Sequence, residues 1–274
     1  MNDCFQNLPH TNPRAFIWLI SISLILIGWF SGFAQEKTGF QSDSIRVESR
    51  VLPYRILFPK NYSPAKKYPL VLFLHGRGEQ GTDNQLQLVH GSSLFLADSN
   101  RLRFPAIVVF PQCPKGDYWS NVRITGDSTG KRHFDFQNGG EPNWSMKALM
   151  ALLDSLKKQY RLDRKRLYVC GLSMGGAGTL ELLARKPSTF AAAFAICGGA
   201  HPQQARKIRK TPLWLFHGEK DDVIDPLFSK QLFTEIKRLN GHVQLRLYPT
   251  ANHNSWDSTF HEPNLLPWLF SHRK

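Results

Sequence analysis

The stretch RLYVCGLSMGGAG, from Arg166 to Gly178, combines a strand, a one-residue corner and the start of a helix. The apolar run Leu167–Cys170 favours a strand, and helix-forming residues follow Ser173 at once. Ser173 stands in a G-x-S-x-G pattern, in which the flanking glycines permit a turn too tight for Cβ atoms. A serine at such a corner has a strained backbone and presents its Oγ at the end of a sheet. Because the bare pattern also arises by chance, the surrounding chain has to decide its meaning.

Buried apolar runs alternate with amphipathic segments on both sides of this corner. The predicted strands are two strands within 45–58, then 68–74, 106–110, 167–170, 190–197, 212–216 and an edge-like strand at 243–248. The predicted helices are 82–98, with an interruption at Gly91 as the alternative, 144–160, 173–186, 226–239 and 263–270, and residues 115–142 form the longest irregular stretch. Continuous apolar strands that alternate with helices predict an α/β fold with a mostly parallel central sheet and helices on both faces.

The N-terminal segment has the features of a secretory signal. Residues Ala15–Phe30 are almost entirely apolar, and the small residues of Ser31–Ala34 suit cleavage after Ala34. The alternative is an uncleaved membrane anchor, although the apolar run is shorter than the roughly 20 residues that span a bilayer. We therefore expect a signal peptide at 1–34, a single catalytic domain at 35–274, and a periplasmic or extracellular protein without stable membrane insertion.

Charge and cysteine content exclude several classes of protein. The net charge of +14 favours acidic substrates or polyanionic surfaces, but no nucleic-acid-binding motif accompanies it. The mature chain keeps an odd number of cysteines, Cys113, Cys170 and Cys197, which argues against a disulfide framework. No cluster of His, Cys or acidic residues has metal-ligand spacing, and the glycine-rich loops lack a suitably placed phosphate-binding lysine. We expect no metal, no cofactor and no nucleic acid.

Two further strand ends supply the partners that a serine nucleophile needs. His253 follows the last predicted strand and can act as the base that accepts and returns the Ser173 proton. Asp221 follows the preceding strand and can fix the imidazole tautomer, with Asp222 and Asp225 as nearby alternatives. The carboxyl ends of parallel strands meet at one edge of the sheet, so we expect these side chains to converge there.

An oxyanion hole requires two backbone N–H groups near the nucleophile. The N–H of Met174 lies directly after Ser173, at the start of the predicted helix. The second N–H is predicted to come from the glycine-rich loop His75–Gly78, with Arg77 as the chosen donor. Each such donor typically contributes about 3 kcal/mol to transition-state stabilisation.

Five segments in consistent order carry a family resemblance: LHGRGEQGTDN, PQCP, GLSMGG, FHGEKDD and the terminal NHNSWDSTF with LLPWLF. Over about residues 50–272 the chain resembles the secreted bacterial α/β-hydrolases of the phospholipase/carboxylesterase and polyhydroxybutyrate-depolymerase-like group, often described as dienelactone-hydrolase-like esterases. The resemblance implies an α/β-hydrolase fold and a serine esterase. It gives triad roles to Ser173, Asp221 and His253, and places Arg77 and Met174 at the oxyanion hole. An arginine at position 77 departs from the small or apolar residue expected there.

The irregular stretch 115–142 is the expected determinant of specificity. Three of its aromatic residues either form a substrate-binding wall or anchor the stretch to the core: Trp119, Phe134 and Phe136. Four basic residues can give the pocket rim a positive field that recruits acidic substrates: Arg77, Arg123, Lys131 and Arg132. The predicted substrate is a small-molecule or polysaccharide-linked acyl or phenolic ester. Two alternatives remain, a serine peptidase of the prolyl-oligopeptidase-like type and a non-catalytic binding module.

Overall fold

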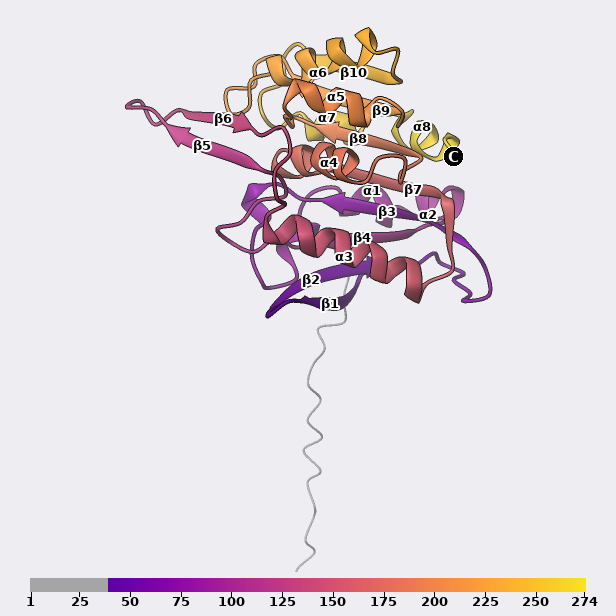
Figure 1. Ribbon diagram of the computed structural model, residues 1–274. Coiled ribbons are helices and arrows are strands. Elements are labelled where there is room, and N and C mark those ends of the chain that lie inside the picture. Colours follow the sequence, from indigo (N-terminus) through magenta and orange to yellow (C-terminus); the bar gives the residue numbers. More distant parts are fainter. Residues whose placement is uncertain (1–38) are drawn as a thin grey trace, which may run out of the picture. The chain divides into compact units, whose positions relative to one another are not determined.

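The computed structural model describes residues 39–274, in which an eight-stranded sheet carries helices on both faces beside a separate two-stranded hairpin (Figure 1). The strands are β1 (Gln41–Val47), β2 (Arg50–Leu57), β3 (Tyr68–Leu74), β4 (Ile107–Pro111), β5 (Val122–Gly126), β6 (Arg132–Phe136), β7 (Leu162–Leu172), β8 (Ala192–Ile196), β9 (Leu213–Gly218) and β10 (Val243–Tyr248). The order in the large sheet is β1-β2-β4-β3-β7-β8-β9-β10. Strand β2 is antiparallel to both of its neighbours, and the other neighbouring strands are parallel.

Eight α-helices and three short 3₁₀-helices are described. They are α1 (Ser92–Leu96), α2 (Asp98–Arg103), α3 (Trp144–Gln159), α4 (Met174–Arg185), α5 (Ala205–Ile208), α6 (Leu227–Arg238), α7 (Trp256–Phe260), α8 (Leu265–Ser271), η1 (Arg77–Glu79), η2 (Leu86–Leu88) and η3 (Pro202–Gln204). Helix α3 begins after Asn143, whose side chain accepts the Met146 N–H at 2.9 Å, and ends with Lys157 and Lys158 in its last turn. Both features stabilise helix ends.

The apolar side chains form one core on each face of the sheet. On one face, α3, α4, α5 and α6 contribute side chains such as Met146, Leu180 and Ile236. On the other face, α1 and α8 contribute Phe95 and Leu269. Strands β3 and β4 are buried along their whole length, as expected for strands covered on both faces. The predicted α/β class, with a mostly parallel sheet between two helical layers, is confirmed.

One prediction of local structure is confirmed in its interrupted form, and one is wrong. The segment 82–98 is divided into η2, α1 and the start of α2, because Gly91 has φ +82° and interrupts the helix at the position that the sequence analysis named. The predicted irregular stretch 115–142 contains the antiparallel hairpin β5–β6, which projects beyond the body of the sheet (Figure 1). Its turn is closed by the Asp127 carboxylate, which accepts the N–H groups of Thr129 and Lys131. This local hydrogen bonding is the signal that the sequence interpretation missed.

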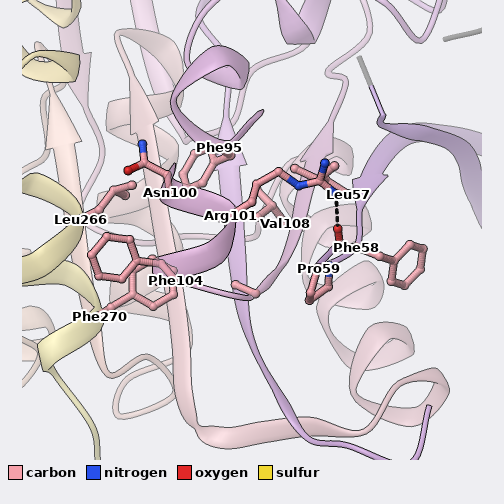
Figure 2. A pocket seen from close by; sticks show the side chains of 11 residues that line it. Leu57, Phe58, Pro59, Phe95, Asn100, Arg101, Phe104, Val108, Leu266 and Phe270 are labelled. Atoms are coloured by element: carbon pink, nitrogen blue, oxygen red, sulfur yellow. Dashed lines mark hydrogen bonds between the residues drawn. The ribbon is translucent and has the colours of Figure 1, made fainter. Parts of the chain in front are cut away.

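An apolar cavity lies on the α1–α8 side of the sheet and is shown in Figure 2. Phe95, Phe104 and Phe270 line it, and the Arg101 guanidinium beside it donates a hydrogen bond of 2.8 Å to the Phe58 carbonyl (Figure 2). Its volume is about 10 Å³, close to the space that one water molecule needs. A cavity of this size is a packing feature rather than a substrate site.

The N-terminal predictions lie largely outside the described residues, since the signal peptide was placed at 1–34. Within residues 39–274, no helix combines the length and apolar character needed to cross a membrane. The three cysteines of this part of the chain, Cys113, Cys170 and Cys197, are buried and free. This agrees with the expectation that no disulfide framework supports the fold.

Candidate active site

Ser173 occupies the corner between β7 and α4. Its backbone has φ 52° and ψ −118°, a conformation that L-residues other than glycine rarely adopt. The Ser173 N–H donates to the Ile196 carbonyl at 2.8 Å, and its carbonyl accepts the Ala177 N–H at 3.0 Å. Strain of this kind costs on the order of 1–3 kcal/mol and persists only where surrounding contacts hold it. The two hydrogen bonds to β8 and α4 are such contacts.

The glycines of the corner are required by the approach of neighbouring backbone. A Cβ atom on Gly171 would collide with the carbonyl of Gly175, and one on Gly175 would collide with the Leu74 carbonyl at the end of β3. No side chain can move aside to relieve these contacts, because the obstructing atoms are backbone. The sequence-based explanation of the G-x-S-x-G pattern therefore agrees with the packing.

His253 lies in the loop that follows β10, with its ring against Ser173. Its Nε2 is 2.9 Å from Ser173 Oγ. Its Nδ1 is 2.8 Å from Oδ2 and 3.0 Å from Oδ1 of Asp221. Because an ionised carboxylate only accepts, Nδ1 carries the proton and Nε2 is free to accept the Ser173 hydroxyl. The structure thus brings Ser173, His253 and Asp221 into one continuous hydrogen-bonded chain.

Asp221 follows β9, and its side chain is fully buried. Its Oδ1 accepts the N–H groups of Val223 and Ile224, each at 2.9 Å. Burial alone would raise the pKa of Asp221, but hydrogen bonds from His217 and His253 outweigh it and hold that pKa well below its usual range. The carboxylate is therefore ionised at neutral pH.

The two alternative acids point elsewhere. Asp222 pairs with the Asn252 side chain at 3.1 Å, and Asp225 accepts the Leu227 N–H at 2.8 Å. Within residues 39–274, neither of them contacts the His253 ring. The geometry therefore favours Asp221 among the acids that the sequence left open.

His217, near the end of β9, is a buried neighbour of Asp221. Its buried Nε2 lies 3.1 Å from Asp221 Oδ2 and 2.9 Å from the Ile224 carbonyl. Both are acceptors, so Nε2 carries a proton and donates. Its Nδ1 lies 2.7 Å from the Ser229 hydroxyl on α6. The spacing His217-Gly218-x-x-Asp221, in which both residues flank a tight strand end, was the available signal.

The two predicted oxyanion donors lie at the starts of helices. Arg77 is the first residue of η1, and Met174 is the first residue of α4. Within the described part of the chain, no acceptor is recorded for either N–H. A Cβ built on Gly76 would lie 3.6 Å from Ser173 Cβ, so this loop runs close beside the serine. Both N–H groups are available to a ligand.

The His75 side chain stabilises the loop His75–Gly78 through hydrogen bonds at both ring nitrogens. Its buried Nε2 accepts the Cys113 N–H at 2.9 Å, and its Nδ1 lies 2.6 Å from the Gly76 carbonyl and donates to it. Burial lowers the pKa of His75 to about 4. His75 is therefore neutral at physiological pH, and its two hydrogen bonds give it a structural role in this loop.

A pocket of about 360 Å³ opens over Ser173 and is called here the Ser173 pocket. Its volume lies within the range typical of small-molecule sites. It is lined by Gly76, Arg77, Gly78, Glu79, His90, Tyr118, Arg132, Phe134, Leu172, Ser173, Val223, Ile224, His253 and Trp256. Residues of η1, β6 and the loops after β9 and β10 therefore share one site, and only part of this lining was foreseen.

The three aromatic residues predicted as a substrate wall divide between the pocket and the core. Phe134 lines the Ser173 pocket. Trp119 is fully buried beside Gly178 of α4, and Phe136 packs on Gly199 and, at 5.0 Å between ring centroids, on Phe228. Trp119 and Phe136 do not line the pocket and have the anchoring positions weighed as the alternative. We therefore remove both from the set of substrate-binding residues.

One group of possible metal ligands overlaps this site. Cys197, Asp221 and His253 each place one ligand atom within 4.8 Å of the others. Burial raises the pKa of the Cys197 thiol, which disfavours the thiolate that binds metals. Asp221 and His253 are already engaged with each other and with Ser173. These residues fit proton transfer better than metal binding, and the expectation that the protein needs no metal stays a prediction.

Comparison with known proteins places the chain in a family. Residues 49–230 match the model of the Esterase family, described as "Putative esterase". A bifunctional acetylxylan esterase/xylanase from Neocallimastix patriciarum is 32% identical over 168 residues, which cover 61% of this chain and 21% of that protein.

Two solved structures show the same fold. The crystal structure of a thermostable esterase is 32% identical, with a TM-score of 0.76, and the match covers 86% of this chain and 64% of that one. A ferulic acid esterase is 17% identical, with a TM-score of 0.62 over 85% of this chain and 98% of that one, and this likeness supports the fold alone. The chain spans about a fifth of the length of the acetylxylan esterase/xylanase and 64% of the thermostable esterase. These matches confirm the α/β-hydrolase resemblance, and the protein belongs to the Esterase family.

Proposed function

We propose that this protein hydrolyses carboxylic esters through a covalent acyl-enzyme on Ser173. The observation that carries the proposal is the chain of contacts from Ser173 Oγ through the His253 ring to Asp221, at 2.9 and 2.8 Å. A strained corner aims the hydroxyl into the Ser173 pocket, and a base lies within proton-transfer distance of it.

In the first half of the reaction, Ser173 Oγ attacks the ester carbonyl while His253 Nε2 accepts its proton. The bond to the alcohol then breaks, and His253 returns the proton to the leaving oxygen. In the second half, a water molecule gives a proton to His253 and attacks the acyl-enzyme, which releases the carboxylic acid and Ser173. Asp221 keeps the proton of Nδ1 in place and stabilises the imidazolium that forms in each half.

The negative oxygen of each tetrahedral intermediate is assigned to the free N–H groups of Arg77 and Met174. Donors fixed before the reaction need no reorganisation when charge develops, which is the basis of oxyanion stabilisation. The Met174 N–H also lies at the start of α4, where the helix dipole adds favourable partial positive charge.

The proposed substrates are acyl or phenolic esters linked to polysaccharides or to small molecules. The description of one relative as an acetylxylan esterase supports the acyl esters of this class. We further propose that the protein is exported to the periplasm or the exterior, which rests on the apolar segment and the small residues before Gln35. An N-terminus at Gln35 in the secreted protein would support export, and an intact N-terminus would contradict cleavage.

The proposed reaction is tested with a fluorophosphonate probe and an ester panel. The panel contains short p-nitrophenyl esters, acetylated xylan and methyl ferulate, together with aminoacyl-amides. We expect probe labelling and ester turnover in the parent protein, and a decrease in kcat of about 10⁴–10⁶ in Ser173→Ala. Ser258→Ala, which changes an exposed serine on α7, is the matched control and should behave as the parent.

Each other outcome favours a different function. Cleavage of amides without ester turnover would favour the peptidase, and folded protein without labelling would favour a binding module. Turnover of long acyl chains only would contradict the proposed substrate class.

A further inference from the structure

Two arginines face the Ser173 pocket without a carboxylate partner. Arg77 belongs to η1 and Arg132 to β6, and both line the pocket. Among residues 39–274, no ion pair is recorded for either guanidinium. Arg123 on the same hairpin is different, since it pairs with Asp135 at 2.7 Å. The positive charges of Arg77 and Arg132 at the pocket are therefore not compensated by a carboxylate, whereas that of Arg123 is.

Tyr118 and Phe134, which line the Ser173 pocket, both interact with these arginines. The guanidinium carbon of Arg132 lies 5.8 Å from the centre of the Phe134 ring, within the range of a cation–π contact. Burial raises the pKa of the Tyr118 hydroxyl, and the positive charges of Arg77 and Arg132 oppose that rise. Tyr118 lines the same pocket, so the positive charges of both arginines act on a hydroxyl inside the site.

The acidic residue of the pocket does not cancel these charges. Glu79 lies against His90, with 3.7 Å between Oε1 and Nε2. Burial raises the pKa of Glu79, and its Oε2 has no hydrogen-bond partner. A raised pKa favours the neutral form of Glu79, so Glu79 opposes the positive charges of Arg77 and Arg132 less than an ordinary exposed carboxylate would.

We propose that the Ser173 pocket selects esters that carry a carboxylate, which Arg77 and Arg132 bind while Ser173 attacks the ester. This inference rests on the proposed ester hydrolysis and names the substrate class of the same site. Two sources supply the same chemistry. The carboxylate can belong to the acyl half, as in a dicarboxylic half-ester, or to the alcohol half, as in an acylated uronic acid.

Arg132 is the better residue to replace. The backbone N–H of Arg77 is assigned to the oxyanion hole, so a change at position 77 could also affect catalysis. Charge-assisted hydrogen bonds from a guanidinium are stronger than those between neutral groups. We expect the ratio of kcat/KM for an anionic ester to that for a matched neutral ester to fall by about tenfold in Arg132→Gln. Most of the change should appear as a higher KM for the anionic ester, and Arg132→Lys should recover part of it.

The test has two arms that separate the two sources. The first arm compares monomethyl glutarate with dimethyl glutarate, per ester group. The second arm compares an acetylated methyl glucuronoside with the acetylated methyl glucoside. Each pair is measured with the parent, Arg132→Gln, Arg132→Lys and the control Arg123→Gln, in low and high salt. Arg123 is an ion-paired residue of the same hairpin outside the pocket, so its loss should leave the ratio unchanged.

The outcomes separate this inference from the proposed function. A preference for the anionic ester in either arm supports the inference, provided that it weakens in Arg132→Gln and in salt. Equal turnover of anionic and neutral esters in both arms overturns it and leaves ester hydrolysis intact. An equal effect of Arg123→Gln also overturns it, because the general charge of the chain would then explain the preference. Absence of turnover of every ester, together with absence of probe labelling, would overturn the proposed function itself.

Discussion

Nε2 of His217 lies 3.1 Å from Oδ2 of Asp221, the same oxygen that lies 2.8 Å from Nδ1 of His253. One carboxylate oxygen thus accepts from two histidines, of which only His253 reaches Ser173. Because His217 is buried and also bound to Ser229 and the Ile224 carbonyl, its ring has little freedom to turn. We conclude that His217 positions the Asp221 carboxylate and keeps it ionised, without contacting the substrate.

Replacing His217 should therefore change the pH profile as well as the rate. The hydrogen bond from His217 is the largest influence that lowers the pKa of Asp221 against the effect of burial. In His217→Leu that pKa rises toward its ordinary value, so the additional loss of activity that follows protonation of Asp221 should begin at a higher acidic pH than in the parent protein. The loss of one hydrogen bond to a charged group is worth about 1.5–3 kcal/mol, which is roughly tenfold to a hundredfold in kcat.

Two further variants test whether the effect comes from the hydrogen bond between His217 and Asp221. His217→Gln retains a donor and should recover part of both effects, whereas Ser229→Ala removes only the outer partner and should change them less. A variant that loses stability while its pH profile stays in place would show that His217 only packs the core.

Asp221 and Asp222 provide a second test, because they are adjacent and equal in size and charge. Asp221→Asn leaves His253 without its ionised partner and should lower kcat by about 10⁴. Asp222→Asn loses only an exposed contact with Asn252 and should stay close to the parent. Steady-state kinetics on one p-nitrophenyl ester measures both. A comparable loss in the two variants would contradict the assignment of Asp221 to the triad.

The elements that the sequence predicted well are those whose local pattern agrees with their packing. The corner at Ser173, the buried strand at β3 and the amphipathic helix α3 each carry their own periodicity or turn signal. The hairpin β5–β6 was missed, since it depends on a turn that the Asp127 carboxylate closes. The interruption at Gly91 was raised only as an alternative, because it depends on one backbone angle. The roles of Trp119 and Phe136 stayed open between a substrate wall and core anchors for another reason. A sequence shows that a loop carries aromatic residues, but only the tertiary structure shows which of them face the core.

His75 should make stability depend on pH between about 4 and 6.5. Its folded pKa is lowered to about 4 by burial, whereas its ordinary value is 6.5. In this range the unfolded chain binds a proton that the folded chain does not, so stability rises with pH and is lost as pH falls. The difference corresponds to roughly 3 kcal/mol. Urea unfolding across this range should show a shallower dependence in His75→Gln than in the parent protein. Parallel curves for the two proteins would argue against a buried neutral His75.

Phe134 and Phe136 are matched residues of β6 that should separate binding from stability. Phe136 is buried against Gly199 and Phe228, so Phe136→Ala leaves a cavity and should cost about 3–5 kcal/mol of unfolding free energy. Phe134 is half-buried and lines the Ser173 pocket. Phe134→Ala should cost clearly less stability than Phe136→Ala and should raise KM for esters with bulky acyl or alcohol groups.

Urea unfolding and ester kinetics on both variants measure the two effects. A strong loss of stability in Phe134→Ala, with KM unchanged, would make Phe134 a second anchor and leave the pocket without an aromatic wall on the hairpin side.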